Sequence, residues 1–409
     1  MKKIAIVLLS TVVCGTLASA KIVQQFEPEK DTSAFGGKPE VSFNADLTFN
    51  YQGLNQTYDL YNKTGELDLQ PGLSLPTANF DINAKVMSGF NVKLETMLSS
   101  HHHNETYVKG GYATIDNLDF IVPGFASSFM QNATIRVGVD DINFGDDHFR
   151  RTDNADVMRN PFIHNMAVEA YMQAPHLEIF YRLPANTFAL IGITNGQVNP
   201  DDVVEKSGSN RPGVYGKVGY DTQLSDTLRL RISESVYYVK GTNKGTSLFS
   251  GDKAGTVSRK IFDDGTDTDF GSLWNAMSGF ADITLSHTNF FLKYQDTEFY
   301  GLYEFADGAD STGKDMKLNH YAVDLVQRFA NDKFFAAARY ENAVVEYADA
   351  ANDLGDAKLT QYQLGLGWFL SKNAVAKIEY IDQKREKNSA FVGGDAEFKG
   401  YMISTALSF

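Results

Sequence analysis

The chain has 409 residues, of which 43% are hydrophobic and 22% are charged, and this balance excludes an intrinsically disordered protein. Cys14 is the only cysteine, which excludes a disulfide scaffold and a cysteine-ligated zinc site. The formal net charge of −14 argues against nucleic acid as the main partner.

Residues 1–20 have the layout of a secretory signal peptide. Two lysines precede an apolar run over residues 4–13, and small residues follow through Ala20. We therefore expect export, with cleavage after Ala20. An uncleaved anchor is the weaker alternative, because the apolar run is shorter than the ~20 residues that span a bilayer. Lipidation at Cys14 is also disfavoured, because residues 11–13 match a lipidation box poorly.

Strict alternation of apolar and polar residues follows the presumed cleavage site. Val41–Tyr51 reads V-S-F-N-A-D-L-T-F-N-Y, with every odd position apolar and every even position polar. Successive strand side chains point to opposite faces, so this segment predicts a strand with one apolar and one polar face. Its eleven residues match the ~9–11 that cross a membrane as a tilted strand. The same alternation recurs at residues 80–86, 90–95, 133–140 and 361–370.

The whole pattern predicts sixteen strands, which begin near residues 41, 78, 90, 106, 131, 175, 187, 213, 227, 274, 288, 318, 333, 359, 374 and 398. Short turns are expected at Ser88-Gly89, Pro184–Asn186, Ser225-Asp226, His287, Asn331-Asp332 and Lys372-Asn373. Long loops are expected at 52–77, 143–165, 196–211, 241–272, 301–317, 348–358 and 385–397. Short turns on one side and long loops on the other are typical of outer-membrane barrels.

Three segments depart from this regular pattern. Residues 117–131 fall where a short turn is expected and predict a small helix. The strand at Leu273–Leu285 is the least regular, and Glu234 falls on the lipid side of its strand. A bulge there, or a different register, would explain Glu234.

The sequence therefore predicts an all-β fold, a transmembrane antiparallel up-and-down β-barrel of sixteen strands, with fourteen or eighteen as alternatives. The expected divisions are the signal peptide (1–20), a periplasmic N-terminal segment (21–40) and the barrel (41–409). The final strand adds an independent sign, because its alternating residues resemble the signature that the bacterial barrel assembly machinery recognises: Tyr401, Ile403, Leu407 and the terminal Phe409.

Two longer motifs carry a resemblance to a known family. They are N-A-V-A-K-I-E-Y-I-D-Q-K-R-E (373–386), before the last strand, and F-G-D-D-H-F-R-R-T-D-N-A-D-V-M-R-N-P-F-I-H-N (144–165), after the fifth. With the overall layout, they resemble sixteen-stranded bacterial porins of the phosphate-selective porin-like superfamily. The resemblance implies an outer-membrane channel for passive diffusion of small hydrophilic solutes, a homotrimer, and a long third loop that folds into the lumen. Phosphate selectivity is not implied, because the family's dense arginine ladder is missing.

The segment 144–165 carries the expected pore constriction: Asp146, Asp147, His148, Arg150, Arg151, Asp153, Asp156 and Arg159. Opposed charges at a narrow point favour polar over apolar solutes. The alternative is an external loop that packs on itself through the same ion pairs. If the segment enters the lumen, Pro161-Phe162 would anchor it to the wall.

The polar parity of the regular strands predicts the lining of the lumen. The expected wall residues are Lys85, Lys93, Arg136, Arg182, Arg229, Arg231, Arg328, Arg339 and Glu341. The same parity places three more basic residues on this face, Lys217, Lys293 and Lys377, and eight more acidic ones: Asp46, Asp81, Glu95, Asp140, Glu178, Asp282, Asp324 and Glu379. Basic and acidic residues therefore nearly balance there, so the excess negative charge is expected in the loops and turns. Acidic loops at the outer mouth would set a local potential that reaches ~8 Å at physiological salt.

Other functions have less support in the sequence. His101-His102-His103 could capture a metal, but consecutive loop residues seldom converge on one ion, so we expect no metal site and no cofactor. His148 beside Asp147 lacks a recognisable nucleophile, so we expect no enzyme. A surface receptor or adhesin that acts through acidic extracellular loops is the alternative function. The expected partners are outer-membrane lipids, the barrel assembly machinery, periplasmic chaperones and small hydrophilic solutes, but not nucleic acid.

Overall fold

The computed structural model describes residues 24–60, 63–68, 71–99, 105–151, 158–195, 212–240, 247–249, 274, 279–310, 312–347, 356–386 and 395–409. Within these ranges, the strands are β1 (Glu40–Leu60), β2 (Lys63–Asp68), β3 (Gly72–Met87), β4 (Phe90–Ser99), β5 (Glu105–Ile115), β6 (Ala133–Asp141), β7 (Gln173–Leu183), β8 (Thr187–Thr194), β9 (Gly213–Ser225), β10 (Leu228–Val239), β11 (Phe280–Tyr294), β12 (Thr297–Asp310), β13 (Asp315–Phe329), β14 (Phe334–Tyr347), β15 (Ala357–Ser371), β16 (Ala374–Glu386) and β17 (Ala396–Ser408). The helical elements are α1 (Ser127–Met130) and the 3-10 turns η1 (Asp147–Phe149) and η3 (Ser247–Phe249).

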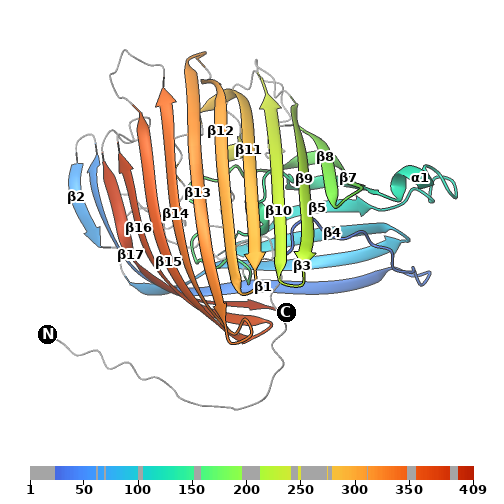
Figure 1. Cartoon of the computed structure of the whole chain (residues 1–409), viewed down its shortest axis with the longest axis horizontal. Helices are drawn as coiled ribbons and strands as arrows, with labels where there is room; N and C mark the ends of the chain where they lie inside the picture. The colour runs from blue at the N-terminus through green and yellow to red at the C-terminus, as the bar shows by residue number, and fades with distance from the viewer. Residues whose placement is uncertain are drawn as a thin grey trace.

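The strands close into one antiparallel barrel of sixteen strands, as the alternation predicted (Figure 1). From β3 to β17, each strand pairs with the next one along the chain. β1 closes the circle by pairing with β17 on one side and with β3 on the other. On the same side of β1, β3 pairs with residues 40–52 and the short β2 pairs with residues 55–60. β2 and β3 together therefore fill one position of the wall.

Alternation decides which face of each strand points outward. On β15, Leu364 and Leu366 are each 59% exposed, whereas the neighbouring Gln361 and Gln363 are 1% and 0% exposed. Because neighbouring side chains of a strand lie on opposite faces, the exposed apolar face is the outside of the barrel. The buried face, rich in polar residues, is called the inner face below. No helix among the described residues is long and apolar enough to cross a membrane.

Most of the expected turns are present. Ser88-Gly89, Pro184–Asn186, Asn331-Asp332 and Lys372-Asn373 each connect two strands. At Ala185 and Asn186, φ is +58° and +59°, the left-handed conformation that tight hairpin turns require. The expected turn at Ser225-Asp226 lies one residue later, between Ser225 and Leu228. The short helix expected within 117–131 is α1.

The predicted turn at His287 is wrong. β11 runs without a break through His287 to Tyr294, and the chain turns at Gln295-Asp296 instead. His287 and Asn289 are buried polar residues of the inner face, so their polarity reflects the interior of the barrel rather than a solvent-exposed turn. Ile283 and Leu285 of the same strand are also buried, so the inward face is the opposite one from that expected from Asp282.

Two of the expected long loops are largely strand. Inside the range 52–77, β1 extends to Leu60 and pairs with β2. Inside the range 301–317, β12 continues to Asp310 and β13 begins at Asp315. Backbone pairing continues where an apolar face is no longer needed, so hydrophobic alternation does not mark these extensions. The expected loops at 196–211, 241–272, 348–358 and 385–397 lie mostly outside the described residues.

Glu234 lies on the outer face, as the parity of β10 indicates, and no bulge occurs at this position. Its pairing with Val218 of β9 and with Thr288 of β11 is continuous. The Ser286 hydroxyl donates to Glu234 Oε1 at 2.6 Å, and the Thr288 hydroxyl donates to Oε2. The carboxylate is therefore held by two hydroxyl groups of the neighbouring strand.

Candidate functional site

All nine expected wall residues lie on the inner face, where acidic partners hold most of the basic ones. Lys93 Nζ lies 3.0 Å from Asp81 Oδ2, Arg328 Nε lies 2.9 Å from Glu298 Oε1, and Arg339 Nε lies 2.6 Å from Asp324 Oδ1. The remaining wall residues contact other strands, the N-terminal segment (residues 24–33) or the segment after β6 (residues 142–172). They are Lys85, Arg136, Arg182, Arg229, Arg231 and Glu341. The expected wall residues are therefore held in ion pairs and hydrogen bonds.

The segment after β6 is bound to the inner face of distant strands. The Ile163 N–H donates to Glu379 Oε2 on β16 at 2.6 Å, and the Val168 N–H donates to Glu341 Oε1 on β14 at 2.9 Å. Lys377 Nζ donates to the Asn160 carbonyl at 2.7 Å. These bonds join the described parts of the segment to strands more than 170 positions away in the chain.

Phe162 is the main apolar contact between this segment and strands β13, β14 and β15. Its side chain is fully buried and packs in an apolar cluster with Val326, Phe335 and Phe369. The Arg339 guanidinium lies 4.3 Å from the centre of the Phe162 ring, a cation–π contact.

Asp146 is the centre of a buried charge cluster. Lys217 Nζ lies 2.7 Å from its carboxylate, and Arg231 donates to both carboxylate oxygens at 2.8 Å. Burial alone would raise the pKa of Asp146, but the Arg231 and Lys217 charges hold it well below its usual range. Asp146 therefore stays ionised and ties the segment to β9 and β10.

The other expected constriction residues also face partners outside the stretch 144–165. Arg150 Nη2 lies 3.5 Å from Asp324 Oδ2 on β13, and Arg151 Nε donates to Glu169 Oε1 at 2.9 Å. Arg159 Nη2 donates to Gln25 Oε1 at 2.6 Å. These contacts join the segment to β13 and to the N-terminal segment. Asp153 and Asp156 lie outside the described residues.

His148 is buried with its ring 3.8 Å from that of Phe149. Burial lowers the pKa of His148 to about 4, so the imidazole is neutral at physiological pH. Asp147, its neighbour, accepts a hydrogen bond from the Tyr300 hydroxyl.

The N-terminal segment, residues 24–33, also contacts the inner face, which no sequence pattern indicated. Arg229 donates to the Gln24 carbonyl at 2.6 Å, and Arg182 donates to the Pro28 carbonyl at 2.8 Å. Phe26 is 6% exposed, and the Arg231 guanidinium lies 4.2 Å from the centre of its ring. The described part of the expected N-terminal segment 21–40 is thus joined to the wall by these contacts.

Glu27 is the main charged contact of this segment. Its carboxylate lies 2.7 Å from Arg231 Nη1 and 3.0 Å from Lys217 Nζ, so it shares both cations with Asp146. Burial and Asp146 act to raise the pKa of Glu27, but Lys217 and Arg231 outweigh them and lower it to about 2. Two anions and two cations thus join the N-terminal segment, the segment after β6 and the wall.

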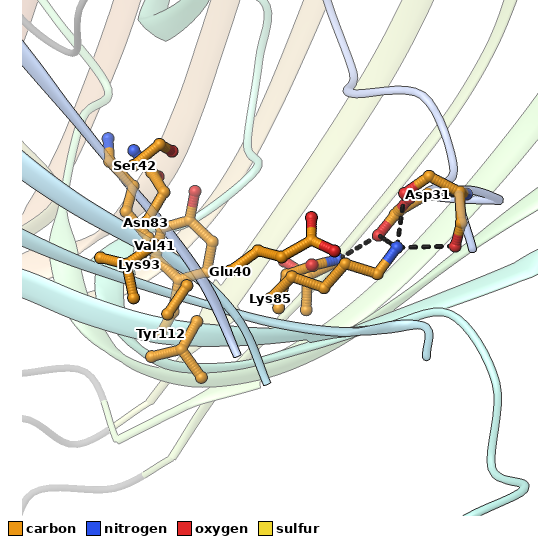
Figure 2. Close-up of a pocket in the computed structure, with 13 residues that line it drawn as sticks. Asp31, Glu40, Val41, Ser42, Asn83, Lys85, Lys93 and Tyr112 are labelled. Atoms are coloured by element: carbon orange, nitrogen blue, oxygen red, sulfur yellow. Dashed lines mark hydrogen bonds and ion pairs between the residues drawn. The ribbon is translucent and has the colours of Figure 1, made fainter. Parts of the chain in front are cut away.

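The N-terminal segment continues along a cavity of about 520 Å³ beside β1, β3, β4 and β5. Figure 2 shows the Lys85 side chain extended toward Asp31. The distance between Lys85 Nζ and Asp31 Oδ2 is 3.0 Å. Lys30 Nζ donates to the backbone carbonyls of Asp116 and Ala133 at 2.6 and 2.9 Å, and also to that of Met130. The pKa of Asp31 is lowered because hydrogen bonds from Ser33, Lys85 and Asn91 outweigh its burial.

Part of the inner face is apolar, which polar parity did not predict. Ile283, Leu285 and Leu318 are buried there, in one cluster with Val168 and Met172 of the segment after β6. Here the segment and the wall share a hydrophobic core.

The expected assembly signal lies on the outer face of β17 and just beyond it. Tyr401 and Ile403 are 47% and 45% exposed, Leu407 is half-buried, and Phe409 is 69% exposed. The role of these residues in assembly stays a prediction. His101-His102-His103 lie outside the described residues.

Comparison with known proteins shows a likeness in fold. The outer-membrane channel DcaP of Acinetobacter baumannii has a TM-score of 0.58 at 10% identity, and the match covers 92% of this chain and 99% of DcaP. The anion-selective porin of Comamonas acidovorans has a TM-score of 0.51 at 11% identity, with 91% and 100% covered. The trimer form of OmpT of Vibrio cholerae has a TM-score of 0.51 at 14% identity, with 91% and 100% covered.

Sequence comparison adds nothing to this. No family model matches the chain, and no curated protein matches it by sequence. The structural likeness shows that the chain has the β-barrel fold of outer-membrane channels.

Proposed function

We propose that the protein is a porin of a bacterial outer membrane, through which small hydrophilic solutes and ions diffuse passively. The observation that carries this proposal is the contrast between the two faces of the closed barrel: an exposed apolar outside suited to lipid, and an inside lined by paired charges. The distant likeness to outer-membrane channels supports it.

We further propose that the segment 144–165 and the N-terminal segment together form the constriction. Their contacts with Lys217, Arg231 and Asp324 support this, because charges at a narrow point create a field that acts on passing ions. The expected constriction residues Asp146, Arg150 and Arg151 keep this role in the proposal, and Glu27 joins them.

The assembly proposed for this porin is a homotrimer, inserted by the barrel assembly machinery after export. The trimer form of OmpT supports the stoichiometry, and the layout of residues 1–20 supports the export. An enzymatic role is not proposed, because the sequence offers no recognisable nucleophile beside His148 and Asp147.

A second candidate function is a surface receptor or adhesin, for which the barrel would be only an anchor. The apolar cluster of Ile283, Leu285 and Val168 favours it, because packed side chains on the inner face suit a filled barrel. Single-channel recording in a planar bilayer under a salt gradient separates the two functions. A porin gives stable, ion-selective current steps, whereas the absence of steps from folded, inserted protein would support the anchor and refute the porin.

A further inference from the structure

Three ionisable side chains from three different elements converge beside η1. Asp147 belongs to η1, His287 to β11 and Glu304 to β12, and His287 lies directly opposite Glu304 in the strand register. One potential ligand atom from each residue lies within 4.8 Å of the other two. His287 Nδ1 lies 2.7 Å from Glu304 Oε1, and His287 Nε2 lies 3.4 Å from Asp147 Oδ2.

Each of the three side chains has one polar atom that makes a hydrogen bond and one polar atom that makes none. Asp147 Oδ1 accepts from Tyr300, His287 Nε2 contacts the Asn289 amide at 3.0 Å, and Glu304 Oε2 contacts His320 Nδ1 at 2.5 Å. The remaining atoms have no hydrogen-bond partner although they are buried: Asp147 Oδ2, His287 Nδ1 and Glu304 Oε1. Nδ1 and Oε1 are close, but they are not aligned for a hydrogen bond.

Three unsatisfied buried atoms in one place are costly unless a ligand satisfies them. We propose that Asp147, His287 and Glu304 bind a divalent transition-metal cation of the Zn²⁺ type. Imidazole nitrogen and carboxylate oxygen are both ligands of Zn²⁺, and three protein ligands leave a further coordination position for water. The negative charge of two carboxylates around one imidazole also favours a cation.

The surroundings of the three side chains are those of a supported metal site. Metal-ligating groups are usually held by a second layer of hydrogen bonds. Glu304 is held by His320, whose Nε2 lies 3.3 Å from Glu341 Oε1, and Asp147 is held by Tyr300. The sequence spacing gave no hint of this site, because Asp147 lies 140 positions before His287 in the chain.

Gly145 explains how η1 comes so close to β11. Its φ is +66°, in the left-handed region, and a Cβ atom placed on it would lie 2.8 Å from Cε1 of the His287 ring. A bound cation would therefore cross-link the segment after β6 to the wall. In a porin, it would fix one side of the proposed constriction.

The test measures metal binding directly, so it does not depend on the proposed porin function. Folded, detergent-solubilised protein, first treated with a chelator, is titrated with ZnCl₂ by calorimetry and with CoCl₂ by visible absorption. We expect one site per chain with a Co²⁺ absorption band, and affinity reduced more than about tenfold in His287→Asn and in Glu304→Gln. His176→Gln is the matched control, because His176 is also a buried histidine of the inner face but contacts the Ala174 carbonyl instead.

Equal affinities in the parent, His287→Asn and Glu304→Gln would overturn the proposal and assign any binding to other groups, such as the histidines at 101–103. No binding to the folded parent protein would also overturn it. Gel mobility before and after heating reports whether each variant is folded, and the second ligand variant decides if the first does not fold. Adding Zn²⁺ during bilayer recordings of the parent then tests whether the site affects conduction. If the metal binds but the current does not change, the metal site stands and the proposed constriction at this place is contradicted.

Discussion

Glu27 provides the sharpest test of the N-terminal segment as part of the constriction. Its carboxylate contacts Arg231 and Lys217, whereas Glu29, two residues on, is exposed. Glu27→Gln removes the charge and keeps the shape, and Glu29→Gln is the matched control. The pKa of Glu27 falls from 4.5 to about 2 on folding. At 1.36 kcal/mol per pKa unit, this corresponds to about 3 kcal/mol in favour of the docked segment.

A loss of about 3 kcal/mol would raise the ratio of undocked to docked segment about a hundredfold, since 1.36 kcal/mol is a factor of ten. Single-channel recordings should then show Glu27→Gln spending far more time at a higher conductance than the parent, with Glu29→Gln like the parent. The pH dependence has a definite sign. Because folding lowers the pKa, the stabilisation is fully present above pH 4.5 and is lost as the pH falls toward 2.

Parent channels should therefore approach the behaviour of Glu27→Gln only in strong acid. If Glu27→Gln and Glu29→Gln are indistinguishable from the parent at neutral pH, the segment does not limit conduction through this charge. The same conclusion would follow if acid changed the parent and Glu27→Gln equally.

Three further outcomes follow from other parts of the barrel. Replacing Arg150 and Arg151 by Gln should shift the ion preference of the channel toward cations, because Asp324 and Glu169 lose their basic partners. The shift should shrink at high salt, where charges are screened. Reversal potentials equal to the parent's at low salt would contradict this prediction. In an assay of folding into lipid vesicles, Leu364→Arg or Leu366→Arg should lower the free energy of unfolding by about 2–4 kcal/mol if the site is near the bilayer midplane. Leu73→Arg, near the start of β3, should lower it by about 0–1 kcal/mol. Equal costs would count against an outer face in lipid. Gly145→Ala should destabilise the barrel by about 1–2 kcal/mol from its left-handed φ, before any clash with His287; a thermal midpoint equal to the parent's would refute this.

The sequence predicted the barrel well, because the physics of a membrane strand is local. A residue's own parity decides whether it meets lipid or the interior, so Gln363 and Leu364 could be placed without knowing their neighbours. The same reasoning failed at His287. A polar residue inside a barrel and a polar residue in a turn look alike along the chain, and only the partner across the interior, Glu304, separates them.

The candidate site was predicted in part. The segment 144–165 stood out by its charges, but the partners of Arg150, Arg151 and Asp146 come from positions that sequence spacing does not link. The N-terminal segment gave no signal, because Glu27 resembles any solvated glutamate until Lys217 and Arg231 are placed beside it. Contacts across the interior depend on closure of the barrel, which no local pattern encodes.

The seam between β1 and β17 has a consequence for how the barrel forms. Among the described strands, the other wall pairings join strands that follow one another along the chain, with β2 and β3 sharing one position beside β1. This pairing instead brings Asp46 to Ser408, and the Ala45 N–H donates to the Phe409 carbonyl. Hairpins can form early because their ends are close, whereas a pairing of such long sequence separation carries the largest entropy cost and forms slowly. Until the seam closes, β1 and β17 are two open edges able to add strands from other molecules. The time this intermediate spends open, rather than the stability of the finished barrel, should therefore set its tendency to aggregate.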